Sequence, residues 1–151
     1  MHALSTPLAG GLYVAATTRT GQGLFTEAPL LSGTCVHIVS GRICVGDYDQ
    51  HYRVGRRWLG VGPNRWLVPE AGDAANYVNH SCDANCTFTD RARIIALRMI
   101  PAHAEVTIDY ATTEWDPFWR MTCKCGAPPC RRLVRAANES RSLQKPLANH
   151  P

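Results

Sequence analysis

The sequence lacks long apolar runs and blocks of basic residues. No stretch approaches the ~20 consecutive apolar residues of a membrane-spanning helix, so we expect no membrane partner. Residues 1–11 do not combine a basic start with an apolar block, so we expect no secretory signal and a cytoplasmic or nuclear protein. Lysine is scarce, and the arginines are spread along the chain, which argues against direct nucleic-acid binding.

Long amphipathic helices and internal repeats are also missing. Short alternating or β-branched runs recur instead, separated by turn residues, one such turn being residues 40–42. The predicted strands cover residues 11–16, 23–26, 34–39, 50–54, 66–68, 84–89, 92–100 and 105–108. A short helical turn is predicted over residues 74–79. With 151 residues, 45% hydrophobic and 19% charged, the pattern predicts one mostly β globular domain.

The cysteines point to a metal rather than to disulfides. Their number, seven, is odd, and the expected compartment is reducing. Cys123, Cys125 and Cys130 fall within eight residues that also contain a glycine and two prolines. Thiolates this close together repel one another unless a cation holds them. A structural zinc ion takes four ligands at tetrahedral corners, so the spacing predicts one zinc site that needs a fourth ligand.

The fourth ligand has two candidates in the sequence. Cys82 and Cys86 lie in the nearest polar context, and the spacing alone leaves both open. Cys35 and Cys44 lie in apolar surroundings and are expected to be buried thiols that behave as small hydrophobic residues. Four thiolates would leave no open position for water, so the predicted zinc is structural.

Two further segments are rich in groups that carry chemistry. Asn79-His80-Ser81-Cys82 taken alone is typical of a polar, hydrogen-bonded loop. Glu105-Val106-Thr107-Ile108-Asp109-Tyr110 alternates like a strand and ends in a tyrosine, which taken alone is more often a packing residue than a catalyst. Neither segment identifies a function without the other.

Four segments occur together in one order: Gly21-Gln22-Gly23-Leu24-Phe25, the Asn-His-Ser-Cys segment, the Glu-to-Tyr segment, and Cys-x-Cys-x4-Cys. This order resembles a SET domain followed by a post-SET zinc loop, over residues 11–135. The resemblance implies a mostly β SET-type fold of several small sheets with a C-terminal pseudoknot. It places the SET domain at residues 11–112, the zinc-bound post-SET loop at 113–135 and a flexible tail at 136–151.

The resemblance implies an S-adenosylmethionine-dependent protein-lysine N-methyltransferase. Its implied site residues are catalytic Tyr110, cofactor-binding Thr20, Gly21, Gln22, Asn79, His80 and Leu133, and zinc ligands Cys82, Cys123, Cys125 and Cys130. A histone tail leads as the substrate, with another basic protein as a further possibility. The main alternative is a catalytically silent SET-like module that binds peptides. A small zinc-stabilised nucleic-acid-binding protein is a second alternative, but no recognition helix or aromatic sheet motif is present.

Four positions depart from the family pattern. Asn76 stands where many members have arginine, which puts one cofactor contact in question. Ala84 replaces a proline, and Arg132 replaces a glycine, so the backbone there is expected to differ. Ile108 stands where the family has Phe or Tyr, and the missing hydroxyl would leave the lysine nitrogen less tethered, which favours more than one methylation.

Three aromatic residues lie between Tyr110 and the first cysteine of the zinc loop, Cys123: Trp115, Phe118 and Trp119. They are expected either to wall a channel for the lysine side chain or to pack the zinc loop onto the core. An aromatic wall suits a cation and its methylated products.

Overall fold

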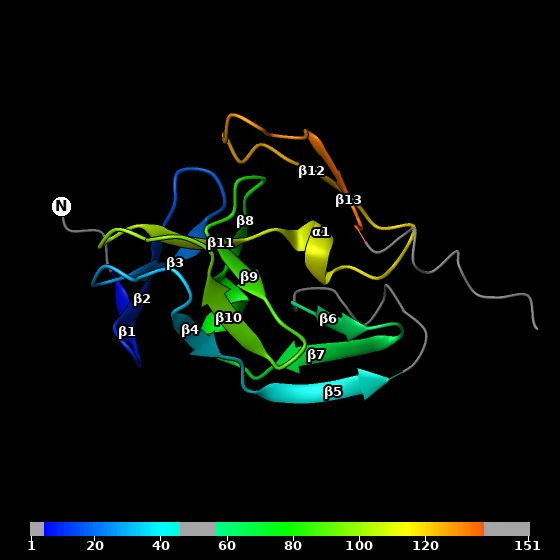
Figure 1. Ribbon diagram of the computed structural model, residues 1–151, viewed down its shortest axis with the longest axis horizontal. Helices are drawn as coiled ribbons and strands as arrows, with labels where there is room; N and C mark the ends of the chain where they lie inside the picture. The colour runs from blue at the N-terminus through cyan, green and yellow to red at the C-terminus, as the bar shows by residue number, and fades with distance from the viewer. Residues whose placement is uncertain (1–4, 46–56, 138–151) are drawn as a thin grey trace, which may run out of the picture.

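The computed structural model describes residues 5–45 and 57–137, and within them short strands form four small sheets (Figure 1). The largest sheet has the strand order β1-β2-β3-β11-β8. Its strands are β1 (Thr6–Leu8), β2 (Leu12–Ala16), β3 (Gln22–Thr26), β11 (Glu105–Ile108) and β8 (Asn79–His80). The prediction of a mostly β domain of several small sheets is confirmed. No helix in the described ranges is long and apolar enough to cross a membrane.

The remaining strands form two three-stranded sheets and one hairpin. They are β4 (Cys35–Ile38), β10 (Arg93–Ala96) and β9 (Cys86–Phe88); β5 (Gly41–Val45), β7 (Arg65–Pro69) and β6 (Leu59–Gly62); and β12 (Arg120–Thr122) with β13 (Leu133–Arg135). A 3-10 helix covers Ala74–Tyr77, and helix α1 covers Tyr110–Thr113. In Figure 1, α1 lies between the β12–β13 hairpin and the β5-β7-β6 sheet, and it contacts both β6 and β13.

Period-two alternation explains the strands that the sequence predicted best. In β11, Val106 and Ile108 are buried in the main core, and the intervening Glu105 and Thr107 point to the opposite face. The same alternation buries Leu12 of β2 in the main core. One face of each strand therefore builds the core, which leaves the other face of β11 for polar groups.

Strand β11 brings together two segments that lie far apart in the sequence. It pairs antiparallel with β3 and parallel with β8, so Thr107 lies opposite Asn79 and Ile108 lies opposite His80. The Asn-His segment and the strand that leads to Tyr110 are thus adjacent. Every functional motif before the zinc loop meets at this central strand.

Some local predictions were wrong, for physical reasons. The turn predicted at residues 40–42 is wrong at Gly41, which begins β5 opposite Pro69. A Cβ on Gly41 would lie 2.3 Å from the Val68 carbonyl oxygen, so this glycine permits a close strand approach rather than a turn. Cys35 is exposed, not buried, because β4 is an edge strand.

Other predicted segments end at different residues in the structure or lie outside the described residues. The helical turn is shorter than predicted and ends at Tyr77, because the following residues enter β8. The strand predicted at residues 50–54 lies outside the described residues, as does most of the predicted tail. Within that predicted tail, Ala136 is buried and the amide of Ala137 donates to the Ala111 carbonyl.

Candidate active site

Tyr110 stands where strand β11 turns into helix α1. Strand β11 ends at Ile108, and Asp109 keeps an extended backbone and caps the helix. The Asp109 carboxylate accepts a hydrogen bond from the Ala111 amide at 3.1 Å, which satisfies one of the unpaired donors at a helix start. Tyr110 is consequently the first residue of α1, and its position is set by both the strand and the cap.

The Tyr110 hydroxyl lies in a buried, polar corner. It donates a hydrogen bond to the Val78 carbonyl oxygen at 2.9 Å, and its ring centroid lies 5.3 Å from that of His80. Burial raises the pKa of the phenol, although the positive charge of Arg57 opposes this shift. Tyr110 is therefore a neutral hydrogen-bond donor near neutral pH, with its oxygen lone pairs still able to accept.

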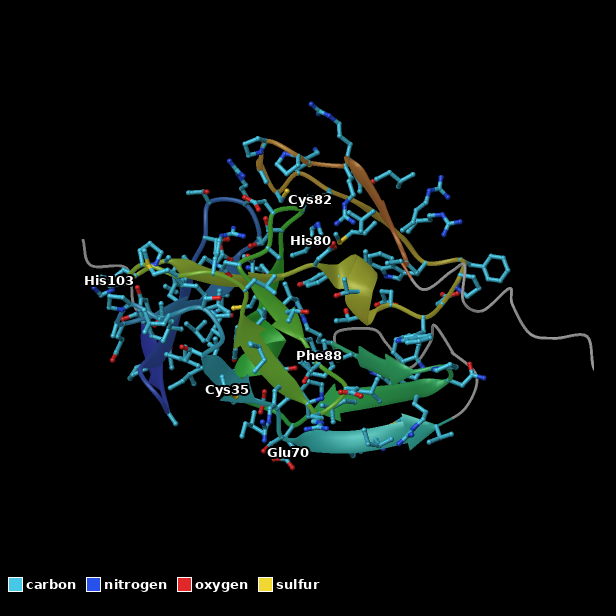
Figure 2. All side chains as sticks on the ribbon, in the orientation of Figure 1. Cys35, Glu70, His80, Cys82, Phe88 and His103 are labelled. Carbon is cyan, nitrogen blue, oxygen red and sulfur yellow. The ribbon has the colours of Figure 1, made fainter. Side chains whose placement is uncertain are left out.

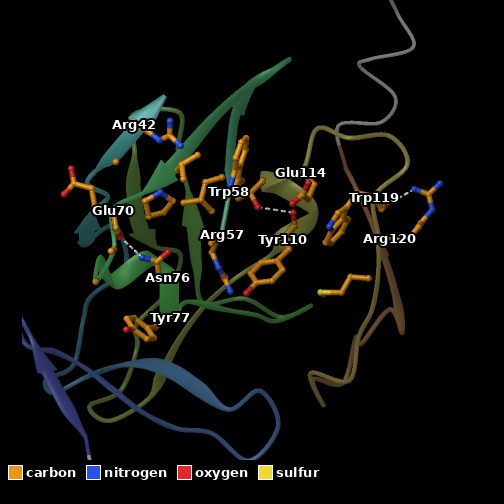
Figure 3. A pocket seen from close by; sticks show the side chains of 18 residues that line it. Arg42, Arg57, Trp58, Glu70, Asn76, Tyr77, Tyr110, Glu114, Trp119 and Arg120 are labelled. Carbon is orange, nitrogen blue, oxygen red and sulfur yellow. Dashed lines mark hydrogen bonds between the residues drawn. The ribbon is translucent and has the colours of Figure 1, made fainter. Parts of the chain in front are cut away.

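Two cavities meet at Tyr110. The first has a volume of about 990 Å³, and Figure 3 shows Arg57, Tyr110 and Trp119 gathered in its wall. The second has a volume of about 630 Å³ and lies against strands β8 and β11 and the start of the zinc loop. Tyr110 and Met121 line both cavities. Both volumes are in the range of pockets that take small ligands or side chains.

The second cavity contains several of the predicted cofactor residues. Thr20, Asn79 and His80 all line it, together with Glu105 and Thr107 from the polar face of β11. This is the face left free by the alternation that buries Val106 and Ile108. The alternation in β11 therefore places polar side chains in the lining of the second cavity, which Tyr110 also lines.

The Asn79 side chain connects three segments around this second cavity. Its amide nitrogen lies 2.8 Å from the Thr20 hydroxyl, the Gln22 carbonyl and a Glu105 carboxylate oxygen. Two amide hydrogens serve these three acceptors. A Cβ on Gly23 would lie 2.5 Å from the same Glu105 oxygen, so glycine is needed there for the carboxylate to approach. Gln22 reaches the site through this carbonyl, because its side chain lines neither cavity.

A cysteine cluster lies beside the second cavity. The ligand atoms of His80, Cys82, Cys123 and Cys125 all lie within 4.8 Å of one another, and the Sγ atoms of Cys82 and Cys123 are 3.8 Å apart. A tetrahedral zinc with Zn–S near ~2.3 Å requires sulfur atoms about 3.8 Å apart. Figure 2 shows His80 and Cys82 together beneath the β12–β13 hairpin. The sulfur spacing fits zinc.

Protonation differs among these thiols. Burial raises the pKa of the Cys125 thiol, but hydrogen bonds from the backbone amides of Cys82 and Ala127 outweigh burial and lower this pKa to about 6. Burial raises the pKa of Cys123 to about 12, so this thiol needs a nearby cation to ionise. A metal ion would supply that charge.

Hydrogen bonding distinguishes His80 from a metal ligand. Its Nδ1 accepts the Tyr110 backbone amide at 3.1 Å, and burial lowers its pKa, so the ring is neutral with its proton on Nε2. That Nε2–H faces the Cys82 sulfur at 3.3 Å as a donor. Cys130 packs in the same small cluster, with its sulfur 3.6 Å from the Cys123 carbonyl oxygen. Cys86, the other sequence candidate, is buried in the main core instead.

Two arginines tie the zinc loop to the site. Arg131 forms an ion pair with the capping Asp109, and its backbone and side-chain nitrogens lie 3.4 Å from the Cys82 sulfur. Arg19 donates to the Cys125 carbonyl from the loop before β3. Arg132 has a φ of 61°, so it adopts the left-handed backbone expected of the glycine it replaces. The zinc loop is therefore bonded to both motifs that flank the cavity.

Other predicted residues lie elsewhere. Leu133 is 44% exposed on β13 and lines neither cavity within the described residues. Ile108 lies in the core, also away from both cavities. Of the three aromatic residues, Trp119 lines the first cavity, whereas Phe118 is 82% exposed. The expected aromatic wall is therefore limited to Trp119 on this segment, and Trp115 packs beside β6.

Sequence reasoning missed three residues at the site. Met121 lines both cavities from β12, Arg57 lies over the Tyr110 ring, and Arg19 bonds to the zinc loop. Arg19 adjoins the glycine motif, a signal that could have found it. Met121 and Arg57 carry no local signal, because their roles arise from how distant strands pack.

Comparisons with known proteins agree with this geometry. Residues 21–111 match the family described as the SET domain. A Saccharomyces cerevisiae protein named "Histone-lysine N-methyltransferase, H3 lysine-4 specific" is 44% identical over 71 residues, which are 42% of this chain and 7% of that protein. The human "Histone-lysine N-methyltransferase 2B" is 30% identical over 132 residues, 76% of this chain and 5% of the relative. The chain thus spans a small part of these relatives.

Proposed function

The chain belongs to the SET-domain family, and from this premise we propose that it transfers a methyl group from S-adenosylmethionine to the side-chain nitrogen of a protein lysine. The observation that carries the proposal is the meeting of two cavities at Tyr110 and Met121. One cavity would hold the methyl donor and the other the lysine side chain. Because both cavities share Tyr110 and Met121 in their linings, the two reactants would meet beside this tyrosine.

The second cavity would hold the methyl donor. Thr20, Asn79 and His80, the cofactor residues that the resemblance implies, line this cavity. Asn79 fixes the glycine loop against Glu105, so the wall is organised without a ligand. Gly21, Gln22 and Leu133 belong to the same proposed set, with Gln22 acting through its backbone carbonyl.

The chemistry requires an uncharged amine in the correct orientation. Free lysine has a pKa of about 10.4, so removal of the amine from water and the positive charge of the donor must both favour the neutral form. S-adenosylmethionine supplies an electrophilic methyl group. The Tyr110 hydroxyl, whose hydrogen is held by the Val78 carbonyl, has lone pairs that accept an amine hydrogen and orient the nitrogen. Such positioning contributes roughly 7–11 kcal/mol to well-oriented reactions.

We further propose one structural zinc ion held by Cys82, Cys123, Cys125 and Cys130. The 3.8 Å between the Cys82 and Cys123 sulfurs fits the ion, and the neutral His80 ring is better suited to donate to Cys82 than to bind metal. Cys130 packs against the same cluster but is not in the group whose ligand atoms all lie within 4.8 Å of one another, so its sulfur would move closer when the ion binds. With four thiolates around it, the ion has no open position for water. Its role is to hold Met121 and the hairpin against the two cavities.

A histone is the proposed substrate, because the similar proteins are named as histone-lysine methyltransferases, several of them specific for H3 lysine 4. A histone substrate would place the activity in the nucleus. Another basic protein tail fits the same chemistry.

The test is transfer of tritiated methyl groups to purified histones and to cell lysate proteins. Wild-type protein should label a lysine, and Tyr110→Phe should bind S-adenosylmethionine equally well but turn over at least ~10²-fold more slowly. Binding of donor and peptide without transfer would support the silent binding module instead. Affinity for DNA that falls with salt, without transfer, would support the nucleic-acid alternative. Metal analysis should find one zinc per chain.

A further inference from the structure

Arg57 lines the first cavity beside Tyr110, which lines both cavities. Its guanidinium carbon is 4.4 Å from the centroid of the Tyr110 ring, and one of its nitrogens donates to the Val78 carbonyl. The Tyr110 hydroxyl donates to the same carbonyl at 2.9 Å. Figure 3 shows the Arg57 side chain directed at the hydroxyl end of Tyr110. A cation already occupies this corner.

The groups that hold Arg57 are those that a lysine nitrogen would use. An aromatic face and carbonyl oxygens attract an ammonium group for the same electrostatic reasons that they attract a guanidinium. Tyr110 and Arg57 line the first cavity, whereas Asn79 and His80 line only the second. A lysine that enters this cavity therefore reaches the corner where the Arg57 charge lies.

We propose that Arg57 is a specificity-determining residue that competes with the substrate: in the free protein its guanidinium occupies the lysine site beside Tyr110, and the substrate must displace it. This inference rests on the proposed function. Only a side chain that brings its own cation and fits the aromatic face can replace Arg57 at no electrostatic loss. Uncharged side chains would leave the Val78 carbonyl with one partner fewer.

The competition lowers the apparent affinity for the substrate. When only a fraction of the protein has the site free, the apparent dissociation constant rises by the inverse of that fraction. A contact of the cation–π type is strong enough to reduce the free fraction roughly three- to tenfold. Removing the guanidinium should therefore lower the KM for a lysine peptide by roughly that factor without lowering kcat.

A positioning role for Arg57 predicts a different change in the two kinetic constants. If the guanidinium served to hold the Tyr110 hydroxyl in place, its loss would lower kcat and leave KM for the peptide unchanged. The two roles are therefore separated by which kinetic constant changes and in which direction.

The experiment compares wild type with Arg57→Gln, Arg57→Lys and Arg93→Gln. Arg57→Gln keeps much of the stem but removes the charge, whereas Arg57→Lys keeps a competing cation. Arg93→Gln removes the same charge from β10, which lines neither cavity within the described residues. Thermal melts confirm that each variant folds. Methyl transfer to an H3 N-terminal peptide gives kcat and KM.

A second measurement is independent of methyl transfer. n-Butylammonium chloride, which mimics the lysine side chain, is titrated into each protein while the NMR signals of the Tyr110 ring are followed. We expect Arg57→Gln to bind it roughly three- to tenfold more tightly than wild type, with Arg57→Lys and Arg93→Gln close to wild type. Unchanged or weaker binding in Arg57→Gln, or a fall in kcat alone, would overturn the inference. Absence of methyl transfer in every protein, with the tighter binding intact, would refute the proposed function and not the competition.

Discussion

The two ring nitrogens of His80 contact different groups, the Tyr110 backbone amide and the Cys82 sulfur, so two substitutions should separate their roles. Nδ1 accepts the Tyr110 backbone amide, and the Nε2 proton faces the Cys82 sulfur. An asparagine side chain can place an oxygen near the position of Nδ1 but is too short to reach that of Nε2. A glutamine side chain can place its amide nitrogen near Nε2 but offers nothing at Nδ1. The pair tests whether the two contacts act independently.

The expected magnitudes follow from what each variant leaves unsatisfied. His80→Asn removes the donor to a zinc ligand, and loss of such an outer contact typically lowers metal affinity by about 10- to 100-fold. His80→Gln leaves the buried Tyr110 amide without an acceptor, which costs about 1–3 kcal/mol. Because that amide belongs to the proposed catalytic residue, part of this cost is expected as a displaced Tyr110 and a lower kcat.

The assay measures both properties on the same samples. Zinc affinity comes from competition with a chromophoric chelator, and kcat comes from methyl transfer at saturating peptide. With zinc in excess, so that both variants remain loaded, His80→Asn should bind zinc more weakly but keep most of its turnover, whereas His80→Gln should keep its zinc affinity and lose turnover. If both variants lost both properties by the same factor, the two nitrogens would not have separate roles. Equal retention of both properties would show that the contacts contribute little.

Three further predictions test the geometry. The Tyr110 phenol should ionise above its ordinary pKa of about 10, because burial raises its pKa. The ultraviolet difference absorbance between wild type and Tyr110→Phe should therefore show that less than half of this phenol is ionised at pH 10, and a midpoint at or below 10 would contradict the effect of burial. Removing the metal with a chelator should lower the melting temperature and turnover together, and unchanged melting in metal-free protein would exclude a structural zinc. Gly23→Ala should destabilise the fold by about 1–3 kcal/mol in denaturant unfolding, because its Cβ would lie 2.5 Å from Glu105, whereas Gly62→Ala, with open space around it, should not.

Much of the fold could be predicted where a strand alternates. Strand β11 was predicted at its observed residues because its apolar positions recur at every second residue and are buried in the core. The hairpin strand Arg120–Thr122 was missed because three residues with one apolar side chain show no period. A turn was predicted at Gly41 because glycine occurs both in turns and where two strands approach closely. Only the nearby Val68 carbonyl, which the sequence does not reveal, shows that Gly41 belongs to the second kind.

The site was predictable to the extent that its residues share short motifs. Asn79, His80 and Tyr110 were singled out by neighbours in the sequence, and the structure brings all three to one cavity. Met121 and Arg57 were not, because a lone methionine and one arginine among many show nothing of the strand packing that places them. Their positions depend on how Arg57 and strand β12 lie relative to Tyr110, which no local pattern encodes.

The contacts around Cys82 suggest how the proposed zinc, with no catalytic role of its own, would still influence the proposed catalysis. Cys82 accepts from His80, whose other nitrogen holds the Tyr110 amide, and from Arg131, which pairs with the Asp109 cap before that tyrosine. Both paths from the proposed zinc reach the same residue through fixed hydrogen bonds. Loss of zinc should therefore lower kcat through Tyr110 even where the second cavity still binds the donor. A zinc that activated water would instead need an open position, and four thiolates leave none.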